Sequence, residues 1–94
     1  MEIALREGIV KVRAVYPNTP AATAGVLVDD VITHVDRAPI AGLPLERVLD
    51  KLGGRPDTQV NLTIRRGETS IDVSMLREMV RVPGAELQVR AEEG

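Results

Sequence analysis

The most informative stretch of the sequence is Asn18-Thr19-Pro20-Ala21-Ala22-Thr23-Ala24-Gly25-Val26. Thr19 is a good helix N-cap, and a proline at the next position suits the first helical turn, where its missing N–H costs nothing. Gly25 supplies the left-handed residue that commonly ends a helix. The stretch therefore predicts a single short helical turn over residues 20–24.

Strand-like sequence lies on both sides of this turn. Residues 3–5 and 9–15 alternate apolar and polar positions around Arg6-Glu7-Gly8, which predicts a β-hairpin. A short strand is predicted over residues 31–35. The two acids before it, Asp29-Asp30, are interpreted as turn or cap residues, because two adjacent carboxylates fall far short of a calcium loop.

The second half of the chain predicts a helix and a second hairpin. Apolar residues recur at i, i+3, i+4 and i+7 over residues 44–52, and Gly53-Gly54 ends this helix. Residues 59–66 and 69–75 then alternate around a tight turn. Further edge strands are expected at 79–82 and 87–90. The Arg65-Arg66 pair is interpreted as a solvated strand end.

This order of elements predicts an α+β fold. We expect a small, bent antiparallel sheet or partial barrel of five to six strands, capped by one short and one longer helix. The domain is expected to cover residues 1–82. Residues 83–94 form a C-terminal tail, interpreted as an edge strand followed by disorder.

The composition of the 94 residues narrows the possible functions. The formal net charge is −2, and Tyr16 is the only aromatic residue, so neither a phosphate-binding stripe nor a stacking platform for nucleic acid is predicted. The absence of cysteine excludes disulfides and thiolate metal sites. No apolar run is long enough to insert into a membrane.

The sequence predicts no catalytic, metal-binding or cofactor-binding residue. The only histidine, His34, has no second histidine or cysteine to complete a metal site, and it is interpreted as a solvent-facing strand residue. Ser70 and Ser74 lie in a predicted strand without a nucleophile elbow.

Four segments together resemble the PDZ domain of the bacterial carboxyl-terminal processing (tail-specific) serine protease family. Residues 18–26 resemble the family run G-S-P-A-x-x-A-G-hydrophobic, and residues 29–36 resemble G-D-x-I-x-x-hydrophobic-[DN]. Residues 45–54 resemble its groove helix, and residues 59–67 resemble the strand that follows. In addition, Met75-Leu76-Arg77-Glu78 resembles the L-x-R-E exit toward the catalytic domain.

Three departures from this family pattern stand out. Asp29 replaces a usual glycine, so its turn must tolerate a side chain, and Arg37 stands where glycine is common. The family also has a Gly-hydrophobic-Gly loop that would fall just before or at Met1 and whose N–H groups grip a peptide carboxylate. That loop is missing from this sequence.

The resemblance implies that the chain binds an extended peptide by strand addition beside an apolar wall. Leu45, at the first helix position, would select an apolar residue two places before the peptide terminus, with an affinity on the order of micromolar or weaker. An alternative is that the helix stripe, including Val48, is only core. The expected edge is Glu2, Ile3, Ala4 and Leu5, and the expected wall is Leu45, Leu49 and Leu52. Replacing Leu49 with Glu is expected to abolish binding without unfolding the domain.

Three functions are considered on this basis. By resemblance, the chain is a substrate-recognition and gating module of an exported, periplasmic or extracytoplasmic, serine endopeptidase whose Ser/Lys dyad lies in a separate domain. Its expected partners are an unfolded protein C-terminus and the catalytic domain of the same parent chain, and the isolated piece is expected to be monomeric. An alternative is a docking PDZ module of another exported or membrane-associated protein. The third function, catalysis by this chain itself, predicts turnover in a peptidase assay, and we expect none.

Overall fold

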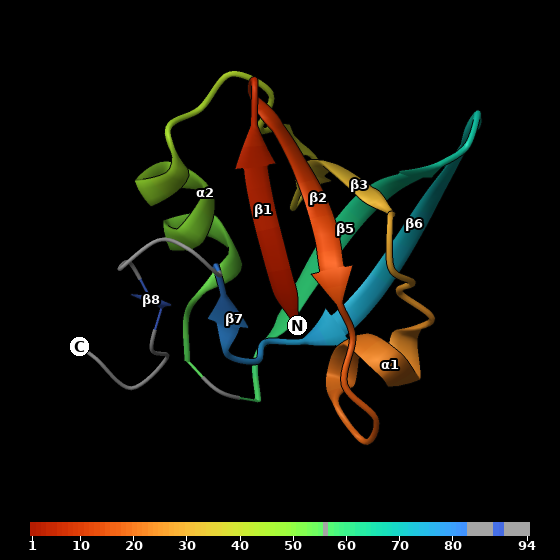
Figure 1. The fold of residues 1–94 in the computed structure, drawn as a ribbon. Coiled ribbons are helices and arrows are strands. Elements are labelled where there is room, and N and C mark those ends of the chain that lie inside the picture. Colours follow the sequence, from red (N-terminus) through yellow and green to blue (C-terminus); the bar gives the residue numbers. More distant parts are fainter. Residues whose placement is uncertain (56, 83–87, 90–94) are drawn as a thin grey trace.

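The computed structural model describes residues 1–55, 57–82 and 88–89 (Figure 1). The described residues form one bent sheet with a helix at its lower end and a second helix along one side. The elements are β1 (Glu2–Arg6), β2 (Ile9–Ala14), α1 (Pro20–Ala24), β3 (Val31–Val35), β4 (Ala38–Pro39), α2 (Leu45–Leu52), β5 (Gln59–Arg66), β6 (Thr69–Leu76), β7 (Val80–Arg81) and β8 (Gln88–Val89).

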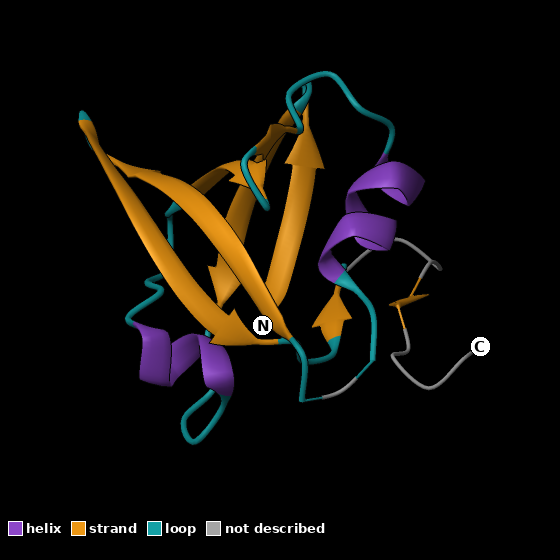
Figure 2. Ribbon diagram, turned by 180° about the vertical axis from the view of Figure 1, so that it is seen from behind, coloured by secondary structure: helices purple, strands orange, loops and turns teal. Residues whose placement is uncertain are grey.

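The strands follow the order β6-β5-β3-β2-β1-β7-β8, and β4 pairs with β3. The predicted α+β class is confirmed, and the described part of the chain contains eight strands, two of which, β4 and β8, are two-residue additions to the five or six predicted for the domain. One pair, β1 with β7, is parallel, so the sheet is mixed rather than wholly antiparallel. The reason is geometric: the chain leaving β6 passes the start of β1 and then runs alongside it in the same direction (Figures 1 and 2).

The core follows from the alternation of apolar residues along the strands. On β5, Val60, Leu62 and Ile64 are almost fully buried, and the polar residues between them face outward or lie at intermediate exposure. From the opposite side, α2 adds Val48, Leu49 and Leu52 to the same cluster. Because no aromatic side chain is present in this core, it is built almost wholly from aliphatic groups.

The two helices begin and end largely where the sequence predicts. The Thr19 hydroxyl accepts the Ala22 N–H at 3.4 Å, and Gly25, with φ of +93°, ends α1. In α2, Pro44 occupies the N-cap position, so the helix starts one residue later than predicted. Both helices are short, and burial of one face must therefore stabilise them.

Two hairpins use two-residue turns with left-handed backbone. Glu7 and Gly8 join β1 to β2 with φ of +53° and +78°, and Asp36 and Arg37 join β3 to β4 with φ of +52° and +70°. Such turns match the twist of antiparallel strands, and they favour glycine at the second position. Asp29 also has a positive φ, +79°, so both family glycine positions are left-handed here, although occupied by larger residues.

The structure corrects the interpretation of Arg66. This side chain is not a solvated strand end, because its Nε and Nη2 donate to the two Asp30 carboxylate oxygens at 2.9 and 2.8 Å. Asp30 is 1% exposed, and its carboxylate also accepts the Leu27 N–H at 2.8 Å within a turn, in agreement with the predicted turn or cap role. A buried carboxylate requires such a partner, and no periodicity in the sequence reveals which arginine provides it.

Candidate functional site

The backbone groups of Ile3 and Leu5 point to the outer edge of β1, away from β2. Ile3 lies opposite Val12 of β2, yet the Val12 N–H donates to the Asp30 carbonyl at 2.8 Å and the Val12 carbonyl accepts the Asp29 N–H at 2.9 Å. Val12 therefore directs its backbone away from β1, so the Ile3–Val12 pair is a non-hydrogen-bonded one and the Ile3 backbone faces outward. By alternation, the backbone of Leu5 faces the same way.

The chain's own strand β7 covers the first part of this edge. Glu2 pairs with Arg81, and the Arg81 N–H donates to the Met1 carbonyl at 3.0 Å. Beside this pair, Val80 and Val82 are buried, with 1% and 8% of their surfaces exposed. Figure 2 shows β7 between the start of β1 and α2. Leu5 lies beyond the paired residue, where no described strand borders the outer edge.

The predicted apolar wall on α2 is mostly packed into the core. Leu49 and Leu52 are each 2% exposed, and Val48 is fully buried, as expected for the inward side of the stripe. Leu45 is half-buried and packs against the same cluster, as Leu5 does from β1. Only Leu45 and Leu5 thus keep apolar surface for a ligand, and their binding role stays a prediction.

Two of the predicted edge residues turn their side chains to other contacts. Ala4 lies opposite Lys11 and lines a hollow on the outer face of the sheet. Glu2 accepts a hydrogen bond from the Tyr16 hydroxyl, and this bond raises the pKa of that hydroxyl above its ordinary value. The side chains of Ala4 and Glu2 therefore point away from a peptide groove, and their backbone groups face β2 rather than the outer edge.

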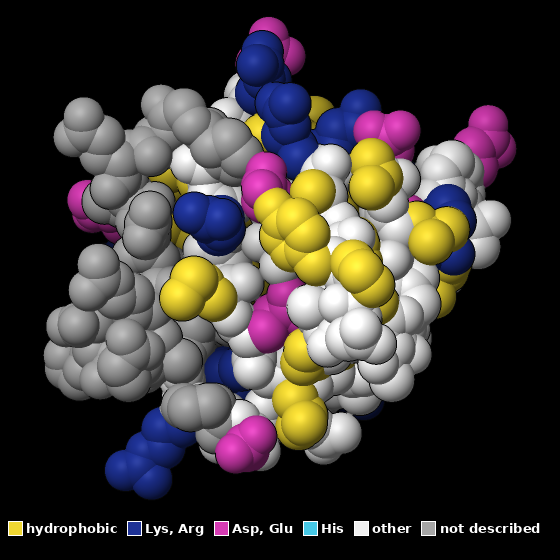
Figure 3. Space-filling model, turned by 60° about the horizontal axis from the view of Figure 1, so that its bottom comes forward, with side chains coloured by type: hydrophobic (Ala, Val, Ile, Leu, Met, Phe, Trp, Pro, Cys, Tyr) yellow, Lys and Arg dark blue, Asp and Glu magenta, His cyan; other side chains and the backbone are white. Residues whose placement is uncertain are grey.

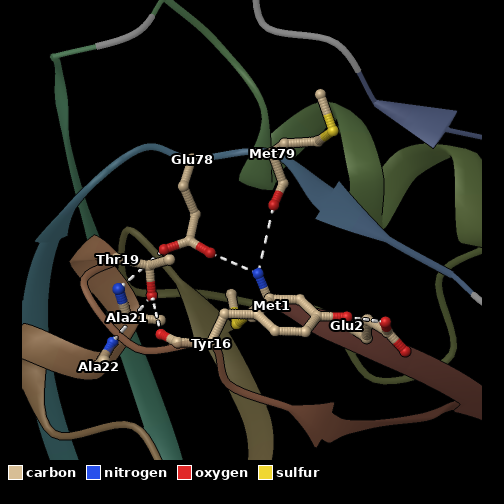
Figure 4. Close-up of polar contacts among 8 residues, drawn as sticks. All are labelled: Met1, Glu2, Tyr16, Thr19, Ala21, Ala22, Glu78 and Met79. Carbon is tan, nitrogen blue, oxygen red and sulfur yellow. Dashed lines mark hydrogen bonds and ion pairs between the residues drawn. The ribbon is translucent and has the colours of Figure 1, made fainter.

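Glu78 forms a junction at the start of β1 that the sequence reasoning did not identify (Figure 4). One carboxylate oxygen accepts the Ala21 N–H at 2.8 Å in the first turn of α1, and the other contacts the main-chain nitrogen of Met1. The Met79 carbonyl lies 3.3 Å from that same nitrogen. Glu78 thus fixes the point where the chain leaves β6 against both α1 and β1.

Arg77, the preceding residue, ties the same part of the chain to the end of α2 and the start of β5. Its guanidinium donates to the Gly53 carbonyl at 2.9 Å and to the Gln59 carbonyl at 2.8 Å. By resemblance, the L-x-R-E pattern indicates only the exit of the chain toward a catalytic domain. In the structure its arginine and glutamate hold β1, α1, α2 and β5 around the candidate edge. The L-x-R-E motif is the one sequence signal that could have indicated these contacts of Arg77 and Glu78.

Among the residues described, no cluster of three metal-ligating side chains occurs, and no helix has the length and apolarity to cross a bilayer. His34 is half-buried rather than solvent-facing, with Nδ1 2.9 Å from the Thr33 hydroxyl. Figure 3 shows the underside of the molecule, where hydrophobic side chains lie in separate small groups among charged ones.

Comparison with known proteins identifies the fold family. Residues 11–66 match the family model described as PDZ domain. The chain belongs to the PDZ domain family. The PDZ chain is 30% identical to a carboxy-terminal-processing protease of Bartonella bacilliformis. The match covers the whole of this chain and 22% of that protein. The PDZ chain is 33% identical to a probable CtpA-like serine protease of Staphylococcus saprophyticus, over 90% of the chain and 17% of that protein.

A solved structure supports the same assignment. The HtrA-type protease AlgW with decapeptide superimposes with a TM-score of 0.62 and 25% identity, over 73% of this PDZ chain and 22% of the protease chain. The family match and the two carboxy-terminal-processing relatives confirm the predicted resemblance to PDZ domains of such proteases. The chain spans only about a fifth of the length of these two relatives.

Proposed function

We propose that this PDZ domain recognises substrates for a carboxyl-terminal processing serine protease by adding an extended peptide to the outer edge of β1. The observation that carries the proposal is the outward-facing backbone of Leu5, beyond the part of the edge that β7 pairs. Helix α2 lies alongside β1 (Figure 1), and Leu45 in its first turn is half-buried. Unpaired N–H and carbonyl groups on a sheet edge are a template for another strand. A peptide side chain placed between Leu5 and Leu45 would contact aliphatic surface only.

The expected affinity is modest. Burying one apolar side chain contributes roughly 1.5–3 kcal/mol, while ordering a flexible peptide opposes binding. Part of the edge is also covered by β7, so a peptide that extends to Met1 has to displace that strand. We therefore expect dissociation constants on the order of micromolar or weaker.

The protease context rests on the relatives. Two of them are named as carboxy-terminal-processing or CtpA-like serine proteases, and the AlgW structure contains a decapeptide. In the proposed parent protein, the catalytic serine and lysine lie in another domain, outside the cytoplasm. The PDZ domain binds an unfolded C-terminus and gates its access to that domain. The isolated chain has no peptidase activity in this proposal.

The test is an NMR titration with three short peptides. One ends in Leu-Ala-Ala with a free carboxylate, one is its C-terminal amide, and one has Asp in place of the leucine. We expect the first peptide to shift the amide resonances of Ile3 and Leu5, and the other two to bind more weakly. Equal shifts from the free and amidated peptides would instead favour a docking module that reads an internal strand. No shift at β1 from any peptide would refute the proposal.

A further inference from the structure

A row of alternating apolar and basic residues crosses the outer face of the sheet. The strand registers place Ala4 beside Lys11, Lys11 beside Val31, and Val31 beside Arg65. Residues directly opposite on neighbouring strands share a face of the sheet. These four residues form a single line on the face of the sheet that points away from the core. They come from four strands, β1, β2, β3 and β5.

This line forms part of the floor of a hollow of about 630 Å³. Around it lie Arg6, Arg13, Ile9 and Val28, and the last two are 46% and 52% exposed. Exposed aliphatic groups enclosed by charged ones are the composition expected of a protein-binding surface rather than of an ordinary solvated face.

The side chains that line the hollow carry an excess of positive charge. Four basic and two acidic side chains line it, although the chain as a whole carries a net charge of −2. Lys11 lies 3.9 Å from Asp29 in an exposed pair, which contributes little. Within residues 1–55, 57–82 and 88–89, Arg6, Arg13 and Arg65 form no ion pair.

We propose that this basic hollow docks an acidic segment of a partner protein, one in which aliphatic side chains lie between Asp and Glu residues. Carboxylates would pair with Lys11 and Arg65, while aliphatic groups would cover Ala4 and Val31. The hollow is separate from the candidate peptide edge, because Ile3 and Leu5 direct their side chains to the opposite face of β1. The two surfaces can therefore be occupied together, and this proposal does not depend on the first.

The test uses the full chain and a peptide of Glu, Asp, Leu and Ala, acetylated and amidated so that neither end is charged. We expect it to shift the amides of Lys11, Val31 and Arg65, whereas the isosteric Gln and Asn peptide does not. The double variant Lys11→Glu/Arg65→Glu should weaken binding roughly fivefold or more. The matched control Lys51→Glu/Arg55→Glu changes the same net charge at two exposed positions away from the hollow, and it should bind as the wild type does.

Several results would overturn the proposal. Equal binding of the neutral peptide would remove the role of charge. Equal loss in the control variant, or displacement by inorganic polyphosphate at the same concentration as by the acidic peptide, would show unspecific attraction of anions. Failure of the acidic peptide to shift the amides of Lys11, Val31 and Arg65 would refute binding in the hollow. If the glutamate variant is poorly folded by circular dichroism, Lys11→Gln/Arg65→Gln replaces it, with the same expected direction.

Discussion

The carboxylate of Asp30 and the guanidinium of Arg66 form a two-pronged pair that joins the start of β3 to the end of β5. Both carboxylate oxygens accept from Arg66, and the same guanidinium donates to the Gly25 carbonyl at the end of α1 at 2.9 Å. Such bidentate pairs are stronger and more directional than single hydrogen bonds. One ion pair therefore fixes three elements that the sequence separates widely.

Replacing Asp30 with Asn is expected to lower the free energy of unfolding by about 2 kcal/mol at neutral pH, the typical value for a hydrogen bond to a charged group. The bonds from Arg66 hold the pKa of Asp30 below its ordinary value of 3.8. A carboxyl whose pKa is lowered by folding stabilises the protein above the unfolded-state pKa, and this contribution is lost as the pH falls through the folded-state value. Thermal unfolding across a pH series should therefore show the two proteins converging below about pH 4.

The neighbouring residue provides the control for this experiment. Asp29 is exposed, and its one ion pair, with Lys11, is long. Replacing Asp29 with Asn, which tolerates a left-handed backbone, should change stability by less than about 0.5 kcal/mol at any pH. A similar pH dependence in both variants would show that the Asp30–Arg66 pair is not the cause.

Replacing Arg37 with Gly should stabilise the domain. Arg37 has a φ of +70° at the second position of the β3–β4 turn, where a side chain is unfavourable. Glycine removes the steric cost of the left-handed backbone, and this gain exceeds the entropy that glycine adds to the unfolded chain. We therefore expect the free energy of unfolding to rise by about 0.5–1 kcal/mol and the melting temperature to rise by roughly 2–8 °C. Arg37→Ala keeps the backbone cost and should show no gain. A gain of equal size in the alanine variant would assign the effect to the lost charge.

Leu45, not Leu49, is the residue at which to test the proposed groove. Leu49 is 2% exposed, so a glutamate there would bury a charge and destabilise the fold, contrary to the expectation from sequence. Leu45 is half-buried in the first turn of α2, where a carboxylate is compatible with the helix dipole. Leu45→Glu should weaken peptide binding roughly tenfold, with little change in melting temperature. Unchanged affinity, measured by calorimetry, would place the peptide elsewhere.

Strand β7 is expected to compete with peptide for the β1 edge. Arg81→Pro removes the N–H that donates to the Met1 carbonyl. Loss of one backbone hydrogen bond amounts to about 0.5–1.5 kcal/mol, so peptide affinity should rise roughly three- to tenfold. Arg81→Ala removes the side chain but retains the N–H, and its affinity should match that of the wild type. Weaker binding by the proline variant would mean that β7 supports the site.

Tyr16 offers an optical probe of the same region, because it is the only aromatic residue of the chain. Its hydroxyl donates to Glu2 at the start of β1, and this bond raises the pKa of the phenol above its ordinary value of 10.0. Glu2→Gln should lower that pKa toward 10.0, which an ultraviolet titration of phenolate absorbance measures. An unchanged titration would show that the hydroxyl and Glu2 do not interact in solution.

The sequence alone determined the helices, the β1–β2 and β5–β6 hairpins and the family, but not the β3–β4 hairpin. Alternation from Val60 to Ile64 and the cap pair Thr19 and Gly25 are local signals, and each acts over a few residues. The resemblance to the PDZ family indicated β1 as the candidate edge, whereas these local rules identified only its strand. They indicated the apolar stripe of α2 as well, without deciding which of its leucines keep exposed surface.

Only the tertiary structure decided the contacts between distant segments. It paired Arg66 with Asp30, directed Glu78 to α1 and β1, buried Leu49, and placed β7 parallel to β1 on the candidate edge. A charged side chain or a two-residue strand has no periodicity, so its partner depends on which surfaces the packed core brings together. That is why the strand β1 was predictable here, while its partial cover by the chain itself was not.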